Sequence, residues 1–205
     1  YEAVNDALNF RREEIPCDVI GLEPGWMEKN YDYSTSKAWS KDRFPIPSYS
    51  FKGTHNFMNS IERMGFKLEL WLCNDYDLSY EEERRLMNKG PVVSQKVSTG
   101  KPSDIVEIDG HLVKETSRKP ALSKDDKLAE KEEPWFDHLK KFIDQGVDFF
   151  KQDGSKQVVE HKGKIWGNGM PDAEMHNLYP LFYSRQMYEG FKAYTNRRPV
   201  VFTPA

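Results

Sequence analysis

The feature that most constrains the fold is the segment Gly146–Ser155, in which a short apolar run turns abruptly polar. Phe149 and Phe150 are typical of a strand buried on both faces, because parallel strands are nearly continuous apolar runs. Lys151 and Asp153 follow at its carboxyl end, where barrel and doubly wound enzymes place their active sites. An Asp here also suits the N-cap of a following helix, and that alternative stays open.

The same pattern of a short apolar run followed by polar residues recurs along the chain, and helical periodicity fills the gaps between the runs. We predict strands near 17–23, 66–73, 147–152 and 199–203, and helices near 2–13, 51–64, 81–87, 134–144 and 172–195. Such alternation favours parallel strands that lie side by side in chain order, with helices outside. The sequence therefore predicts an α/β fold, part of a (β/α)8 TIM barrel with about four parallel strands.

The length of the chain limits how much of a barrel it can form. The 205 residues fall short of the roughly 250 that a complete barrel needs, so we expect the carboxyl-terminal strands to be missing. Residues 1–205 read as a single domain, with a charged insertion at about 89–130. Within the insertion, Ile105–Val113 is typical of a hairpin that turns at Asp109 and Gly110.

Composition and motifs exclude several classes of partner. The net charge is −3 with Lys and Arg spread along the chain, which argues against nucleic acid. No apolar run approaches the roughly 18 residues that a membrane span needs. Zinc-ligand spacing, a glycine-rich phosphate loop and a Gly-x-Ser-x-Gly elbow are all missing, so we expect no metal and no cofactor. Because Tyr1 is not an initiator Met, the sequence reads as an excised piece and leaves the compartment undetermined.

Carboxylates and Trp rings gather at the predicted strand ends. Parallel strands bring these ends to one rim. Carboxylates there can accept hydrogen bonds from the hydroxyl groups of a sugar, and flat rings can stack on it. One carboxylate is then available to attack an anomeric carbon. A magnesium ion would also use carboxylates but would not need the Trp residues. We therefore predict a carbohydrate partner and a sugar site drawn from Glu23, Trp26, Trp71, Asn74, Asp75, Asp77, Lys151 and Asp153.

Four motifs in the same order resemble glycoside hydrolase family 31, the α-glucosidase and α-xylosidase family. Ile15–Met27 is similar to its second barrel strand, and Arg43–Pro47 to its Phe-Pro-Asp-Pro step. Gly146–Asp153 resembles the nucleophile strand in its Lys-x-Asp form, and Met175–Gly190 resembles the His-Asn-x-Tyr…Tyr-Glu-Gly helix. The resemblance implies the amino-terminal part of a catalytic barrel that hydrolyses terminal α-glycosidic bonds with retention of configuration.

The resemblance also assigns roles to single residues. Asp153 would be the nucleophile that forms the covalent glycosyl-enzyme. Lys151 would hydrogen-bond the sugar in the −1 subsite, and its cation would favour the ionised form of Asp153. Glu23 would hold sugar hydroxyls at the closed end of the pocket, which Trp26 and Trp71 would line.

Other interpretations of these residues remain open. Lys151 also suits a salt bridge with a neighbouring carboxylate, and the Trp rings also suit barrel packing. His176 lies in the predicted helix and not at a strand end, so we interpret it as structural. Two alternatives for the whole protein are a sugar-binding barrel without catalysis and an α-galactosidase-type enzyme of the related families 27 and 36. The His-Asn-Leu-Tyr segment argues against the second.

The chain departs from the family pattern at the sugar-recognising rim. Glu23 replaces an Asp, Gly25 replaces an Asp or a bulky residue, and residues 154–155 and 203–205 also differ from the usual pattern. We therefore do not assume glucosidase specificity, and a sugar with an axial O4, such as galactose or N-acetylgalactosamine, is one hypothesis. A retaining enzyme also needs a second carboxyl group about 5 Å from the first. The family places it beyond Ala205, so we expect the 205 residues alone to be inactive.

Overall fold

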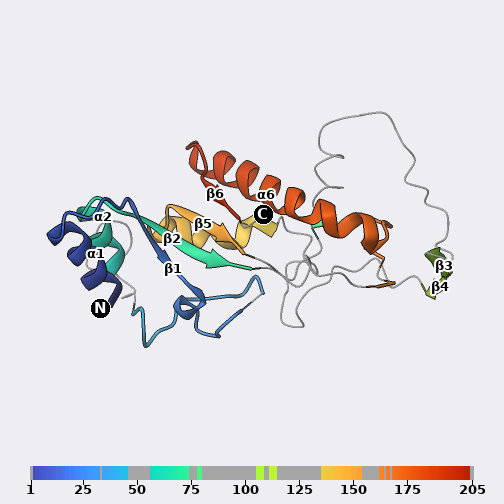
Figure 1. Cartoon of the computed structure of the whole chain (residues 1–205), viewed down its shortest axis with the longest axis horizontal. Coiled ribbons are helices and arrows are strands. Elements are labelled where there is room, and N and C mark those ends of the chain that lie inside the picture. Colours follow the sequence, from blue (N-terminus) through green and yellow to red (C-terminus); the bar gives the residue numbers. More distant parts are fainter. Residues whose placement is uncertain are drawn as a thin grey trace.

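Four parallel strands form the sheet on which the molecule is built. The computed structural model describes residues 2–32, 34–45, 56–73, 78–79, 105–108, 111–114, 135–153, 162–163, 165–166 and 168–203. The sheet has the order β1 (Val19–Leu22), β2 (Lys67–Leu72), β5 (Phe149–Gln152) and β6 (Val201–Phe202) (Figure 1). All three neighbouring pairs are parallel. This confirms the predicted strands, their order and the part of an α/β barrel that they imply.

The helices connect these strands in the predicted alternation. α1 (Glu2–Arg12) precedes β1, α2 (Phe57–Arg63) precedes β2, and the 3-10 helix η2 (Trp135–Leu139) continues into α5 (Lys140–Gln145) before β5. The long helix α6 (Asp172–Thr195) leads to β6. Gly146 ends α5 at a φ of 116°, a left-handed conformation that glycine adopts without steric cost, so the chain turns directly into β5.

Two predicted helices lie partly or wholly outside the described residues. The helix near 51–64 begins at Phe57, where Asn56 caps it by accepting a hydrogen bond from the Asn59 backbone N–H, while residues 51–55 lie outside the described residues. The segment 81–87 lies outside them too. The hairpin is confirmed: β3 (Ile105–Ile108) pairs antiparallel with β4 (His111–Lys114), and Ile108 opposite His111 leaves two residues for the turn. That 89–130 is an insertion stays a prediction.

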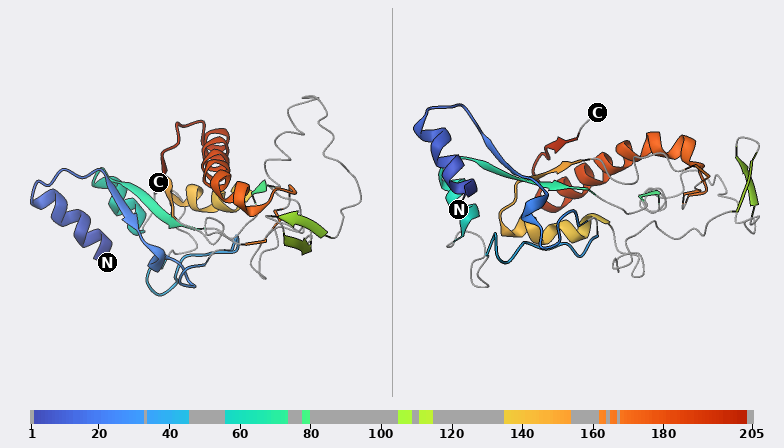
Figure 2. Two further views of the ribbon diagram at one scale, coloured as in Figure 1. Left: turned by 45° about the vertical axis from the view of Figure 1, so that its right-hand side comes forward. Right: turned by 60° about the horizontal axis from the view of Figure 1, so that its bottom comes forward.

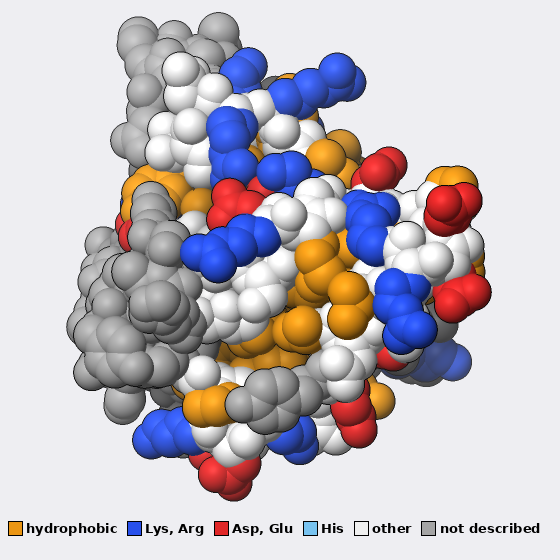
Figure 3. Space-filling view, turned by 90° about the vertical axis from the view of Figure 1, so that its left-hand side faces the viewer, with side chains coloured by type: hydrophobic (Ala, Val, Ile, Leu, Met, Phe, Trp, Pro, Cys, Tyr) orange, Lys and Arg blue, Asp and Glu red, His pale blue; other side chains and the backbone are white. Residues whose placement is uncertain are grey.

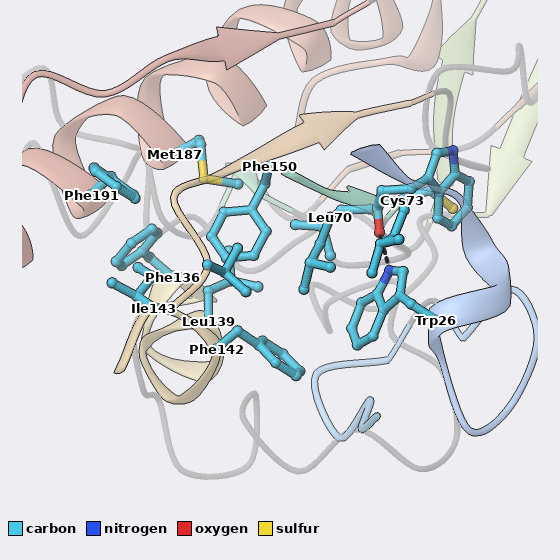
Figure 4. Packing of buried hydrophobic residues seen from close by; sticks show 14 of the residues in the cluster. Trp26, Leu70, Cys73, Phe136, Leu139, Phe142, Ile143, Phe150, Met187 and Phe191 are labelled. Carbon is cyan, nitrogen blue, oxygen red and sulfur yellow. Dashed lines mark hydrogen bonds between the residues drawn. The ribbon is translucent and has the colours of Figure 1, made fainter. Parts of the chain in front are cut away.

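The core lies between one face of the sheet and the helices η2, α5 and α6. Alternate residues of β2 and β5 point to this face, among them Leu70 and Phe150, and both are fully buried. Figure 4 shows them packed against side chains from all three helices, including Phe136, Phe142 and Met187. Figure 2 shows α5 and α6 beside the sheet from two further directions. Because helices fill this face, the charged side chains of β2 and β5 lie on the other face, while Gln152 stays on the helical face and donates to the Tyr183 carbonyl of α6 at 3.0 Å.

The strands begin next to α1 and α2 and run away from them. Only the three residues 64–66 separate α2 from β2, so the amino end of the sheet is near these helices. Figure 3 views that end of the molecule, and hydrophobic side chains gather at its centre between Lys, Arg, Asp and Glu side chains. No helix in the described part of the chain combines the length and apolar character of a membrane span.

A buried Lys-His contact fastens the loop after β1 to η2. Lys37 Nζ lies 3.2 Å from His138 Nε2 and also donates to the Ser34 carbonyl, while His138 Nδ1 contacts the Trp135 carbonyl. Lys37 is 1% and His138 9% exposed. Burial, followed by the nearby Lys37 charge, holds the pKa of His138 well below its usual value. His138 is therefore neutral in the fold, with Nδ1–H donating to Trp135 and Nε2 accepting from Lys37.

This neutral His predicts how stability depends on pH. The unfolded chain binds a proton at His138 below a pH of about 6.5, whereas the folded chain resists it, so stability is present above pH 6.5 and is lost as pH falls. The free energy of unfolding should fall by up to about 1.4 kcal/mol per pH unit from this group. Urea unfolding of the protein at pH 7.5, 6.5 and 5.5 measures the slope, and His138→Gln should make it shallower. Identical slopes for the two proteins would contradict this assignment.

Candidate active site

The second face of the sheet carries the predicted site residues. Strand register places Gly21, Glu69 and Phe149 side by side. Trp71 lies two residues farther along β2, beside Lys151 of β5. Because successive side chains alternate between the faces of a strand, all five belong to the face opposite the helical core.

Glu23 and Asp153 extend this face beyond the strand ends. Glu23 follows β1 in an extended conformation and therefore continues the alternation from Gly21. Asp153 follows β5 on the side of Lys151, and its backbone N–H donates to the Leu72 carbonyl at 2.8 Å. The structure thus brings Glu23, Trp71, Lys151 and Asp153 together at the carboxyl ends of three neighbouring strands.

Lys151 forms an ion pair with Glu23. The Nζ–Oε1 distance is 2.8 Å, and the side chains are 22% and 67% exposed. The hydrogen bond that Lys151 donates to Glu23 raises the pKa of Lys151. Burial opposes this rise, and the charges of Glu23, Asp153 and Glu69 add to it. Lys151 is therefore a firmly protonated cation at the rim. The salt bridge left open by the sequence is present, and because Glu23 is exposed, the pair is accessible from solvent.

Trp71 contacts the carboxylate of Asp153 directly. Its Nε1–H donates to Asp153 Oδ2 at 2.6 Å, so the indole fixes the orientation of the carboxylate. The Trp71 ring itself is 4% exposed. Asp153 is not the N-cap of α6, the next helix among the described residues. That helix begins at Asp172, and Pro171 occupies its N-cap position.

Trp26 lies in the core and not on the surface of a pocket. It has no exposed surface, and its ring packs edge-on against Trp39 and Phe142 at centroid distances of 5.0 and 5.1 Å. Its Nε1–H donates to the Trp71 carbonyl at 2.9 Å, the dashed line in Figure 4. A ring without exposed surface has no face on which a sugar can stack. The packing role therefore replaces the expected pocket-lining role for Trp26, which supports the strand that carries Trp71.

Two residues of this region were missed by the sequence analysis. Glu69 is 9% exposed although it lies between two leucines of β2, and a charge inside an apolar run was the available signal. Tyr31 packs edge-on against Trp71 at 5.6 Å, with 52% of its own surface exposed and a left-handed φ of 56°. No periodic pattern marks Tyr31, because it lies in the loop after β1.

The remaining predicted residues are placed as follows. Asp75, like Asn74 and Asp77, lies outside the described residues, so its predicted role stays a prediction.

His176 lies within α6 and its Nδ1–H donates to the Asp172 carbonyl at 2.8 Å, which agrees with a structural role. At Gly25 a Cβ atom would meet nothing within 4 Å, so there is open space at this position. In the part of the chain that the structure describes, no three His, Cys, Asp or Glu side chains group to hold a metal.

These observations define a class of protein: an α/β barrel domain whose strand ends carry a charged site. The chain matches the family described as "Glycosyl hydrolases family 31 TIM-barrel domain" over residues 2–205. It therefore belongs to glycoside hydrolase family 31, as the four motifs indicated, and not to families 27 or 36.

Relatives of known activity and structure agree with this assignment. The α-xylosidase XylQ of Lactiplantibacillus pentosus is 28% identical over 181 residues, which are 88% of this chain and 21% of XylQ. The dextranase FjDex31A of Flavobacterium johnsoniae, solved as a mutant complexed with isomaltotriose, matches with a TM-score of 0.57 and 21% identity over 100% of this chain and 24% of that one.

An α-xylosidase from a soil metagenome, complexed with xylose, matches with a TM-score of 0.56 and 20% identity over 98% of this chain and 27% of that one. At these identities the structural matches show the fold alone. The chain spans about a fifth of the length of the curated relatives it matches.

Proposed function

We propose that this chain forms the nucleophile-bearing part of a retaining α-glycosidase that hydrolyses terminal α-glycosidic bonds. The observation that carries the proposal is the carboxylate of Asp153, which accepts the Trp71 N–H at 2.6 Å two residues after the Lys151 cation. A nucleophile must be held in orientation and must be ionised. The hydrogen bond supplies the orientation, and the nearby cation favours the charge.

The proposed reaction has two displacements. An oxygen of Asp153 attacks the anomeric carbon while the bond to the leaving oxygen breaks, and a general acid outside the 205 residues gives that oxygen its proton. Water then attacks the same carbon while the group that acted as the acid, now a base, takes a proton from it. The bond to Asp153 breaks, and the sugar leaves with its original configuration. Lys151 and the exposed carboxylate of Glu23 would bind hydroxyl groups of the sugar in the −1 subsite.

The sugar is proposed from two different lines of support. The curated relatives are named α-xylosidases, which favours a xyloside. The longer carboxylate at Glu23 and the open space at Gly25 favour a pocket end unlike that of the glucosidases, which keeps galactosides and N-acetylgalactosaminides as alternatives.

A panel of nitrophenyl glycosides tests the proposal in the complete protein that carries this chain. We expect turnover of the α-anomer of one sugar among xylose, glucose, galactose and N-acetylgalactosamine. Proton NMR of the first product should show the α-configured sugar before it mutarotates, because two inversions restore the configuration. A β-configured first product would contradict a covalent nucleophile. Binding of a sugar by calorimetry without any turnover would instead support the non-catalytic barrel.

A further inference from the structure

A buried carboxylate lies beneath the Lys151–Glu23 pair. Glu69 is 9% exposed and occupies the middle of β2, on the face that carries the site. Strand register puts Gly21 directly beside it on β1 and Phe149 directly beside it on β5. Glu23 and Lys151 each lie two residues beyond these neighbours on the same face. Diagonal neighbours of this kind are about 7–8 Å apart, within reach of long side chains.

Gly21 leaves room for the Glu69 carboxylate because it has no side chain. A Cβ atom at position 21 would lie 3.5 Å from Glu69 Oε2 and 3.6 Å from its carboxyl carbon, so the Glu69 side chain extends over the Gly21 backbone toward β1. Glu23 lies two residues beyond Gly21 in an extended conformation, and its charge acts on Glu69. A side chain larger than Ala at position 21 would push the carboxylate away.

The charges that face Glu69 are those of the site itself. Burial raises the pKa of Glu69, the cation of Lys151 opposes this rise, and the charge of Glu23 adds to it. Lys151 in turn is influenced by Glu23, Asp153 and Glu69. One cation is therefore shared among three carboxylates, of which Glu69 is the one withdrawn from solvent.

We propose that Glu69 is a positioning residue which, together with Glu23, holds the Lys151 ammonium at the rim beside Asp153. Glu23 draws the ammonium from the solvent side and Glu69 draws it from the floor of the site. When a sugar hydroxyl displaces Glu23 from Lys151, the charge of Glu69 keeps the ammonium in place. This inference rests on the proposed function, since Lys151 acts on the sugar only if the sugar binds there.

The first experiment follows the protonation of Lys151 and does not depend on turnover. Competitive acetylation of the complete protein over a pH series, read by mass spectrometry of the Lys151 peptide, reports the pKa of this amine. Glu69→Gln removes one nearby negative charge at nearly constant volume. We expect the acetylation midpoint of Lys151 to fall, because the charge of Glu69 is one of those that raise the pKa of this amine. Glu69→Asp keeps the negative charge, so the acetylation midpoint of Lys151 should stay near that of the parent protein. Glu62→Gln, an exposed change in α2, is the matched control and should shift nothing.

The second experiment measures the pH profile of kcat/KM with the same variants. We expect Glu69→Gln to lower kcat/KM by roughly tenfold to a hundredfold through misplacement of Lys151. The acid limb of the kcat/KM profile of Glu69→Gln should move to lower pH. The variant lacks the negative charge of Glu69, which opposes ionisation of the neighbouring carboxyl groups. Glu69→Asp should recover part of the rate and the parent profile.

The outcomes separate the inference from the proposed function. An unchanged Lys151 midpoint in Glu69→Gln, in a protein whose circular dichroism matches that of the parent, would overturn the role of Glu69 even if the enzyme is active. A protein that turns over no glycoside would overturn the proposed function, while the acetylation midpoint would still decide whether Glu69 holds Lys151. A profile lowered equally at every pH, with no shift of either limb, would reduce Glu69 to a packing residue.

Discussion

Asp153→Ala is expected to lower kcat of the complete enzyme by about four orders of magnitude or more, because the covalent path cannot begin without the carboxylate. The protein should remain folded, since Asp153 lies at the end of β5 and outside the helical core. Added azide should restore part of the turnover by entering the space that the carboxylate left. The product should then be a glycosyl azide of inverted configuration.

Chemical labelling identifies the nucleophile independently of the variant. A fluorinated sugar or cyclitol trap should label the peptide that contains Lys151 and Asp153 in the parent enzyme. Asp75 and Asp77 are internal alternatives, since each is also a predicted strand-end carboxylate. Asp6→Ala, an exposed change in α1, is the control and should leave kcat unchanged. A label on Asp75 or Asp77, or near-normal activity of Asp153→Ala, would show that Asp153 is not the nucleophile.

Gly190→Ala should produce a large loss of stability. Gly190 lies where α6 crosses η2, and an added Cβ would lie 2.3 Å from Cγ of Phe136, whose side chain is 5% exposed. Overpacking of this kind costs roughly 1–3 kcal/mol, and the direct clash with a buried ring puts it at or above the upper end. The better helix propensity of Ala offsets about 1 kcal/mol. A net loss of about 2 kcal/mol should lower the Tm by roughly 4–8 °C, measured by circular dichroism.

Two companions make this prediction specific. Gly25→Ala adds the same methyl group at a position where nothing lies within 4 Å, so its Tm should stay close to that of the parent. Phe136→Leu removes ring atoms that meet the new methyl group. The double variant with Gly190→Ala should therefore lose less stability than the sum of the two single changes. Strict additivity would show that the two side chains do not meet.

The strands, their order and their direction could be predicted from the sequence because the underlying pattern is local. A buried strand such as Phe149–Gln152 shows its apolar run in consecutive residues, and its carboxyl end is marked where the run turns polar. Short right-handed connections then leave few ways to arrange parallel strands. The same locality made the hairpin predictable, since its turn residues and its two arms are neighbours in sequence. The position of Lys151 and Asp153 at a strand end followed from these facts alone.

The distribution of the aromatic and acidic residues around that end was decided only by the tertiary structure. Trp26 and Trp71 look alike in sequence, each near a strand end, yet one is sealed against Trp39 and Phe142 while the other donates to Asp153. Glu69 is a charge inside an apolar run. Its place beside Gly21 and below Lys151 depends on the register between strands whose paired residues are 48 and 80 positions apart in the sequence. Register is set by packing across the sheet, and no single strand carries that information. The sequence by itself determined which residues reach the rim, and the packing of β1, β2 and β5 against one another determined which of them face the site.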